Sequence, residues 1–139
     1  MTTPAIIHFD GGARPSNPGP AAIGYTIETE DWSDEGSDHI GEATNNEAEY
    51  HALIQGLDHA SEKGCTEVEA KGDSKLIVNQ VKGDWQTKEP HLGELRDRVR
   101  EVADEFEEFE IHYIPREENW EADELVDRAF SDWAGLTSK

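Results

Sequence analysis

The hydrophobic pattern changes its period near residue 44, and this change restricts the fold more than any other feature of the chain. Before it, residues 4–10 and 21–28 are rich in β-forming side chains and are bounded by proline and glycine, which is typical of strands. We assign a third, edge strand to the polar segment near residues 30–43. After it, apolar residues recur at helical spacing, and helix-like segments alternate with strand-like ones.

The first helical pattern lies at residues 44–64, where Thr44 and Glu47 form a capping box at the start. Further along we expect a strand, two helices, a strand and a helix, at residues 66–73, 74–83, 91–106, 110–115 and 119–133. The order β-β-β-α-β-α-α-β-α predicts an α/β fold in which a five-stranded mixed sheet is flanked by helices. A chain of 139 residues is expected to form a single domain over residues 1–139, with its core at about residues 4–131.

The charge of the chain is strongly negative. It carries 12 Lys and Arg against 32 Asp and Glu, a formal net charge of −20. Such a charge normally argues against a nucleic-acid partner, because phosphate binding requires basic side chains. The acidic residues are scattered rather than gathered in a tail, so we interpret them as a solvated surface adapted to very high salt, where the Debye length is about 3 Å at 1 M. The alternative is an acidic protein with a basic or small partner.

Targeting and redox signals are weak. No apolar run approaches about 18 residues, so no transmembrane helix is predicted. The N-terminal segment MTTPAIIHFD lacks the features of a signal peptide. Cys65 is the only cysteine, so no internal disulfide can form. We therefore expect a cytoplasmic monomer that does not associate with membranes.

Two carboxylates in the first half of the chain stand out by position. Asp10 ends the first predicted strand beside two glycines, although a turn-forming aspartate would also suit this place. Glu49 lies on the apolar stripe of the helix at 44–64, where an unpaired charge is costly. It therefore needs a partner, which is either a metal ion or a lysine such as Lys71 or Lys75.

Two further carboxylates follow in the second half. Asp73 ends a predicted strand, where α/β sheets favour ligand sites, but it could instead share the capping of the next helix with Ser74. Asp123 lies near the start of the last helix, where the helix dipole favours a carboxylate, and Asp127 competes with it one turn later. Oxygen ligands suit Mg²⁺ or Mn²⁺ rather than zinc. Two such ions are a device for in-line phosphoryl displacement.

Four segments resemble, in order, the signature blocks of the type 1 ribonuclease H family. They are FDGGARPSNPGPAAIGY, TNNEAEYHALIQGL, GDSKLIVNQV and ENWEADELVDRAF, and the similarity extends from about Ile6 to Phe130. The resemblance implies the ribonuclease H-like fold, in agreement with the order of elements above. It also implies a metal-dependent endoribonuclease that hydrolyses the RNA strand of RNA/DNA hybrids by a two-metal-ion mechanism, leaving 5′-phosphate and 3′-hydroxyl ends. With the acidic composition, it indicates a halophilic archaeon or similar high-salt organism as the source.

The resemblance also implies roles for individual residues. Asp10 would bridge the two Mg²⁺ or Mn²⁺ ions, Glu49 and Asp73 would hold one ion, and Asp123 would hold the other, so that these four would be the catalytic residues. Glycine backbone and polar side chains would contact the hybrid, at Gly11, Gly12, Asn17, Thr44, Asn45, Asn46 and Asn119. Helix-start chemistry remains an alternative explanation for Asn45 and Asn46, and helix capping remains one for Asn119.

The chain departs from the family pattern at three points. The segment VKGDWQTKEPHL is short and mildly basic, so we do not expect the basic protrusion of longer members, and we recognise no separate hybrid-binding domain. Arg116 and Glu117 lie where the family often has a mobile histidine, so product release or proton transfer must use another group. Two alternative functions remain: the same chemistry on double-stranded RNA or RNA–DNA junctions, and a non-catalytic hybrid-binding module.

Overall fold

The computed structural model describes residues 2–137, with side chains described through residue 133. Its centre is a five-stranded sheet in the order β3-β2-β1-β4-β5, built from β1 (Pro4–Ala13), β2 (Gly19–Glu28), β3 (Ser33–Ala43), β4 (Glu67–Gly72) and β5 (Glu108–Tyr113). The described residues also form α1 (Asn45–Glu62), α2 (Lys75–Lys82), α3 (Pro90–Ala103), the 3-10 turn η1 (Arg116–Asn119) and α4 (Trp120–Thr137). Strand β2 pairs antiparallel with both β1 and β3, whereas β4 pairs parallel with β1 and β5 pairs parallel with β4. The predicted order of elements and the mixed sheet are confirmed.

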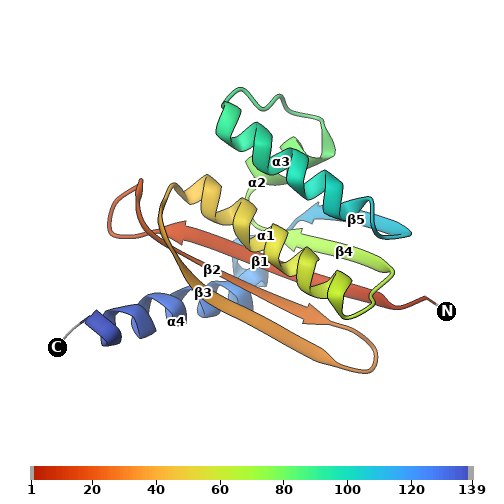
Figure 1. The fold of residues 1–139 in the computed structure, drawn as a ribbon, viewed down its shortest axis with the longest axis horizontal. Coiled ribbons are helices and arrows are strands. Elements are labelled where there is room, and N and C mark those ends of the chain that lie inside the picture. The colour runs from red at the N-terminus through yellow and green to blue at the C-terminus, as the bar shows by residue number, and fades with distance from the viewer. Residues whose placement is uncertain (1, 138–139) are drawn as a thin grey trace.

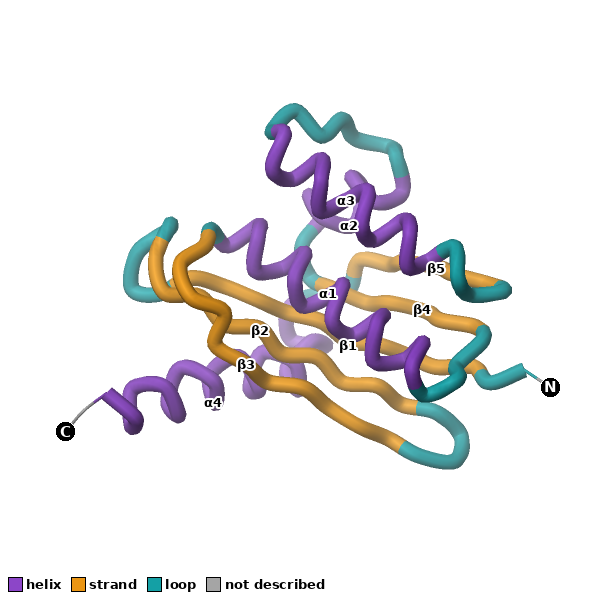
Figure 2. Tube along the Cα trace, viewed as in Figure 1, coloured by secondary structure: helices purple, strands orange, loops and turns teal. Residues whose placement is uncertain are grey.

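Helices cover both faces of the sheet (Figures 1 and 2). Helix α1 packs against β1 and β2 on one face, and α4 packs against β1, β2 and β3 on the other. Adjacent residues of β2 show the alternation, because Ile23 joins the main core on the α1 side while Ala22 packs against Val126 and Ala129 of α4. Helix α2 contacts β5, and α3 contacts α1. The central strand β1 is therefore enclosed on both faces, which makes it a rigid support for side chains at its end.

Strand β1 continues past Asp10 to Ala13, so the prediction that the strand ends at Asp10 and a loop begins at Gly11 is wrong. Gly11 pairs with Ile23 and Gly12 pairs with Ala22 in the antiparallel ladder. Adjacent glycines are a turn signal in a sequence, but here pairing with β2 satisfies their backbone groups. The hairpin loop is reduced to residues 14–18.

The start of α1 agrees with the prediction. The Thr44 hydroxyl accepts a hydrogen bond from the Glu47 N–H at 3.1 Å, and the Glu47 carboxylate accepts one from the Thr44 N–H at 3.0 Å. Ser74 likewise caps α2, since its hydroxyl accepts a hydrogen bond from the Ile77 N–H. Local side-chain chemistry therefore determines where both helices begin.

Two later boundaries differ from the prediction. Helix α3 ends at Ala103 rather than at residue 106, and Phe106 reaches the core from the turn that follows, where its N–H bonds to the Ala103 carbonyl. Strand β5 occupies residues 108–113 rather than 110–115, and η1 then precedes α4, so Asn119 lies in this turn. Within residues 2–137, no helix is long and apolar enough to span a membrane.

Candidate active site

The site lies where β1 outruns β4. Pairing between the two strands stops at Phe9 and Gly72, while β1 continues to Ala13. Asp10 is therefore the first residue of β1 whose edge is not covered by β4. The strand order also changes direction at β1, with β2 and β3 on one side and β4 and β5 on the other. Crevices at such switch points, beyond the carboxyl ends of strands, are the usual ligand sites of α/β sheets.

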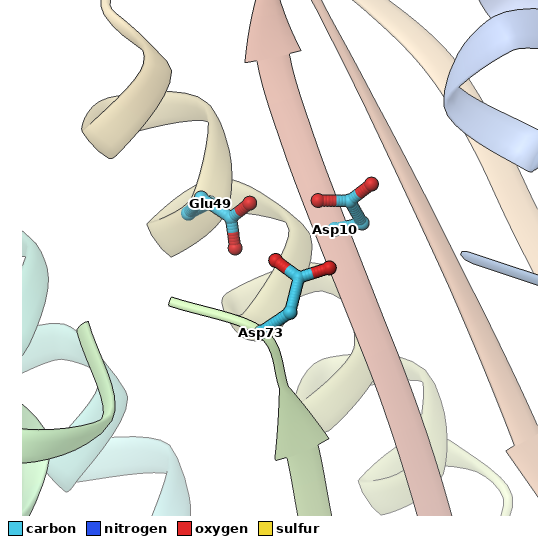
Figure 3. A group of neighbouring side chains, drawn as sticks. All are labelled: Asp10, Glu49 and Asp73. Carbon is cyan, nitrogen blue, oxygen red and sulfur yellow. The ribbon is translucent and has the colours of Figure 1, made fainter. Parts of the chain in front are cut away.

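Three of the four predicted carboxylates converge at this edge (Figure 3). Asp10 of β1, Glu49 of α1 and Asp73 at the end of β4 each offer an oxygen, and these oxygens all lie within 4.8 Å of one another. Asp10 is 8% exposed and Glu49 is 6% exposed. The structure thus brings together side chains that are far apart in the sequence.

Glu49 reaches the cluster because α1 packs very closely on β1. A Cβ atom added at Gly11 would lie 2.5 Å from the backbone carbon and oxygen of Ala48. This approach lets one carboxylate oxygen of Glu49 accept a hydrogen bond from the Gly11 N–H at 3.3 Å. The other oxygen, Oε2, is buried and has no hydrogen-bond partner among the described residues.

The lysine partners considered for Glu49 are engaged elsewhere. The Lys71 ammonium lies 3.8 Å from Glu69, and the Lys75 ammonium lies over the Tyr113 ring, 5.2 Å from its centre. The structure therefore does not support the alternative in which a salt bridge satisfies Glu49.

Burial and mutual repulsion raise the pKa values in the cluster. Burial raises the pKa of Asp10 to about 7; its interaction with Glu49 opposes this shift, while Asp73 and Asp123 add to it. Burial also raises the pKa of Glu49, followed by its interactions with Asp10 and Asp73, and the Gly11 N–H opposes the shift. The pKa of Asp73 is raised by burial and lowered in part by Asn119 and Arg116. A bound cation would relieve this concentration of buried negative charge.

Asp123 lines the same pocket from the first turn of α4, but it lies outside the group of three carboxylates that converge. Its competitor Asp127 has a different partner, because its carboxylate lies 2.6 Å from the Arg14 guanidinium. The structure therefore favours Asp123 over Asp127 as the α4 carboxylate of the site.

Asn119 connects the cluster to the backbone of β1 through hydrogen bonds. Its side chain is fully buried, and its amide group donates hydrogen bonds to the Phe9 carbonyl at 2.9 Å and to Asp73 Oδ2 at 3.2 Å. Its Oδ1 has no partner among the described residues, so the capping explanation is not supported. The side chain that caps α2 is Ser74 rather than Asp73, because the Ser74 hydroxyl accepts the hydrogen bond from the Ile77 N–H. Both side chains are therefore available to shape the site.

The remaining predicted contacts lie around the hairpin and the start of α1. Asn45 Oδ1 accepts a hydrogen bond from the Ala13 N–H at 2.8 Å, and the Asn45 N–H donates to Asn17 Oδ1 at 3.0 Å. These bonds fasten the hairpin to α1. Gly11, Gly12, Asn45 and Asn46 line the pocket, whereas Asn17 and Thr44 are not among its lining residues.

The pocket itself has a volume of about 430 Å³ and is lined by both acidic and basic side chains. Besides the four carboxylates it includes Ser74, Arg14 and Arg116. Sequence reasoning did not single out Arg14, because it lies in a predicted loop and matches no catalytic pattern. The available signal was that basic residues are rare in this chain, with 12 in total, and that Arg14 follows closely after the candidate catalytic Asp10.

The donor set fits a hard divalent cation. The oxygens of Asp10, Glu49 and Asp73 are close enough to share one ion, and Glu49 Oε2 is a buried acceptor without another partner. Carboxylate oxygens are the ligands preferred by Mg²⁺ and Mn²⁺. These residues could therefore hold such an ion, with Asp123 at the border of the same pocket.

Comparison with known proteins identifies the family of the chain. A family model described as reverse transcriptase-like matches residues 8–129. Ribonuclease HI of Halobacterium salinarum is 43% identical over 127 residues, which are 90% of this chain and 63% of the relative. The chain belongs to the type 1 ribonuclease H family.

Solved structures agree with this assignment. RNase H1 from the halophilic archaeon Halobacterium salinarum superposes with a TM-score of 0.89 at 42% identity, covering 93% of this chain and 98% of that one. LC11-RNase H1 in complex with an RNA/DNA hybrid superposes with a TM-score of 0.85 at 43% identity, covering 92% and 97%. The ribonuclease H fold is thus confirmed, and the halophilic source of one relative is consistent with the acidic composition. The chain spans less than two thirds of the length of the curated Halobacterium relative.

Proposed function

We propose that the protein is an endoribonuclease that hydrolyses the RNA strand of RNA/DNA hybrids with two Mg²⁺ or Mn²⁺ ions, leaving 5′-phosphate and 3′-hydroxyl ends. The observation that carries the proposal is the convergence of Asp10, Glu49 and Asp73 within 4.8 Å at the uncovered end of β1. The similarity to a protein whose structure contains an RNA/DNA hybrid supports the substrate. Family membership supports the reaction.

Some residues of the site would hold the cations, and others would orient the substrate. Bound divalent cations supply charge stabilisation for in-line displacement at phosphorus. Asp10, Glu49, Asp73 and Asp123 would hold them, and Asn119 keeps the Asp73 carboxylate turned toward the site through its hydrogen bond. In the displacement, a water oxygen bonds to phosphorus and releases a proton to solvent while the bond from phosphorus to the 3′ oxygen breaks. The products are a 5′-phosphate and a 3′-hydroxyl.

The leaving oxygen must gain a proton, and the pocket offers no histidine for this step among its described lining residues. Arg116 lines the pocket, but a guanidinium does not deprotonate in proteins and so cannot transfer a proton. His112 lies within β5, and its ring contacts Glu110 at 3.4 Å. We therefore assign the proton to solvent in the open pocket.

The substrate contacts would form around the hairpin. Gly11 and Gly12 offer bare backbone beside the carboxylates, where the shallow minor groove and 2′-hydroxyls of a hybrid could approach. Asn45 and Asn46 line the same pocket at the start of α1. Asn17 and Thr44 would act at its margin, the former through the Asn45 backbone and the latter as the cap of α1.

A cleavage assay in high KCl tests the function. A labelled hybrid, double-stranded RNA and an RNA–DNA junction should be compared with Mg²⁺ and with Mn²⁺. We expect cleavage of the hybrid, with 5′-phosphate ends, and loss of at least 100-fold in Asp10→Asn, roughly the contribution of one preorganised charged group. Asp132→Asn, an exposed change on α4, should behave as wild type. Preference for another duplex would redefine the substrate, and binding without turnover would make the protein a hybrid-binding module.

A further inference from the structure

Arg14 lies at the rim of the pocket and is held there by α4. Its Nη1 lies 2.6 Å from Asp127 Oδ1, and its guanidinium carbon lies 4.8 Å from the centre of the Phe130 ring. Its backbone N–H donates to the Pro20 carbonyl at 2.8 Å, which closes the hairpin. Ion pair, ring contact and hairpin together limit the positions that the guanidinium can take.

The same guanidinium remains accessible to a second anion. The Arg14 side chain is 47% exposed and lines the pocket that contains Asp10 and Asp123. The ion pair with Asp127 uses Nη1, whereas a guanidinium offers five N–H donors in a planar fork. Arginine is suited to bidentate contact with phosphate oxygens. A group held on an aromatic ring loses little conformational freedom when it binds such an anion.

The position of Arg14 relative to the carboxylates suggests which phosphate it meets. Asp127, its partner, lies one helical turn beyond Asp123 on α4, a rise of about 6 Å. The partner of Arg14 is therefore displaced along α4 from Asp123, the α4 carboxylate of the pocket, by a distance comparable to one nucleotide step of a strand. Only Arg14 and Arg116 supply positive charge among the described lining residues, in a chain of net charge −20.

We propose that Arg14 binds the backbone phosphate next to the scissile phosphate in the cleaved strand, and that Asp127 and Phe130 position its guanidinium for this contact. The proposal rests on the proposed function, since it names a substrate contact of the same site. It makes Arg14 a binding residue outside the carboxylate set and explains why the hairpin is fastened to α4 as well as to α1.

The chain offers a matched control in Arg128. It also belongs to α4, and its guanidinium is paired with a carboxylate, Glu35, at 3.0 Å. Its side chain is 54% exposed, but it is not among the residues that line the pocket. Arg128→Ala thus removes an arginine–carboxylate pair of similar exposure without removing a predicted phosphate contact.

The test replaces single phosphates of the RNA strand by neutral methylphosphonates around a defined cleavage position. In wild type, one linkage adjacent to the cut should show a rise in KM of roughly tenfold, as expected for one charged hydrogen-bonded contact. Arg14→Ala should show the same rise with the unmodified hybrid and no further rise with that methylphosphonate. Its binding should also have a salt slope that is smaller by about one. Arg128→Ala should retain the full methylphosphonate effect.

Further variants separate binding from a structural tie. Arg14→Lys, which keeps the charge and loses the fork, should recover part of the affinity, and Asp127→Asn, which leaves the guanidinium in place but less restrained, should keep part of the methylphosphonate sensitivity. If Arg14→Ala and Asp127→Asn raise KM and lower Tm alike while both keep the full methylphosphonate effect, Arg14 serves only to tie the hairpin to α4 and the proposal is overturned. Equal methylphosphonate sensitivity in wild type and Arg14→Ala overturns it as well, while the proposed function stands. No cleavage of any hybrid by wild type refutes the proposed function itself.

Discussion

The Asn119 amide group donates a hydrogen bond to Asp73 Oδ2 at 3.2 Å across 46 positions of sequence, and it also bonds to the Phe9 carbonyl. It therefore links the end of β4, the end of the paired part of β1 and the start of α4. This buried side chain thus connects three segments that meet at the site.

Substituting Asn119 by alanine should lower kcat more than it raises KM. The change leaves the Phe9 carbonyl unpaired and Asp73 free to rotate, with a cost in unfolding free energy of about 1–3 kcal/mol. Steady-state kinetics and thermal melting measure both effects. Asn79→Ala, which removes an exposed amide bonded to the Lys75 carbonyl, is the control and should leave kcat unchanged. An unchanged kcat in Asn119→Ala would show that Asp73 needs no such support.

The stability of the metal-free protein should depend on pH through Asp10. Its pKa is about 7 in the folded chain against 3.8 for an ordinary aspartate. The folded state thus holds the proton more tightly, so this contribution to stability is fully present below about pH 4 and is lost as the pH rises through about 7. Asp10→Asn should therefore raise Tm at pH 8 in EDTA. The corresponding gain in unfolding free energy is at most on the order of 4 kcal/mol.

This difference in Tm between Asp10→Asn and wild type should shrink toward pH 4 and should also narrow when Mg²⁺ is added at pH 8. The second effect follows because a cation bound by the carboxylates stabilises the folded wild-type protein, in which Asp10 is charged, and not the variant that lacks this charge. Thermal melting of both proteins across pH, with and without Mg²⁺, is the measurement. A difference that does not vary with pH would mean that Asp10 is ionised equally in the folded and unfolded states.

Gly11 and Gly12 should respond differently to alanine. A Cβ at Gly11 would meet the Ala48 backbone at 2.5 Å, whereas one at Gly12 would have Asn45 Oδ1 at 3.5 Å as its nearest neighbour. Gly11→Ala should displace α1 with Glu49 on it, lowering stability by about 1–3 kcal/mol and impairing cleavage. Gly12→Ala should melt like wild type. Melting curves of the two variants decide, and equal stabilities would contradict the close approach of α1 to β1.

High salt should stabilise the protein. Like charges face each other across β4 and β5, where Glu67 is paired with Glu108 and Glu69 with Glu110 in the ladder. Adjacent like charges destabilise a sheet, and salt screens them. Tm should therefore rise between about 0.1 M and about 1 M KCl, over which the Debye length falls from about 10 Å to about 3 Å. Glu108→Gln should show a smaller rise, and a Tm that is flat in KCl for wild type would refute the high-salt interpretation.

Much of the fold was predictable because local chemistry determines it. The β-forming side chains of the first two strands, the capping box of Thr44 and Glu47 and the hydroxyl cap at Ser74 each act within a few residues, and the corresponding strands and helix starts are found in the structure. The apolar stripe of α1 also placed Glu49 on its buried side, where it lies. Boundaries set by pairing between distant segments were less accurate, as the extension of β1 through two glycines shows.

The sequence by itself determined which residues were candidates for a cation site, because a carboxylate at a strand end or on a buried helix face needs a partner. Only the tertiary structure decided among them. It paired Asp127 with Arg14, turned Asn119 toward Asp73 rather than toward a helix start, and left Glu49 Oε2 without a partner among the described residues. These choices depend on contacts between β1, α1 and α4. The three elements are far apart along the chain, and tertiary packing rather than local propensity brings them together.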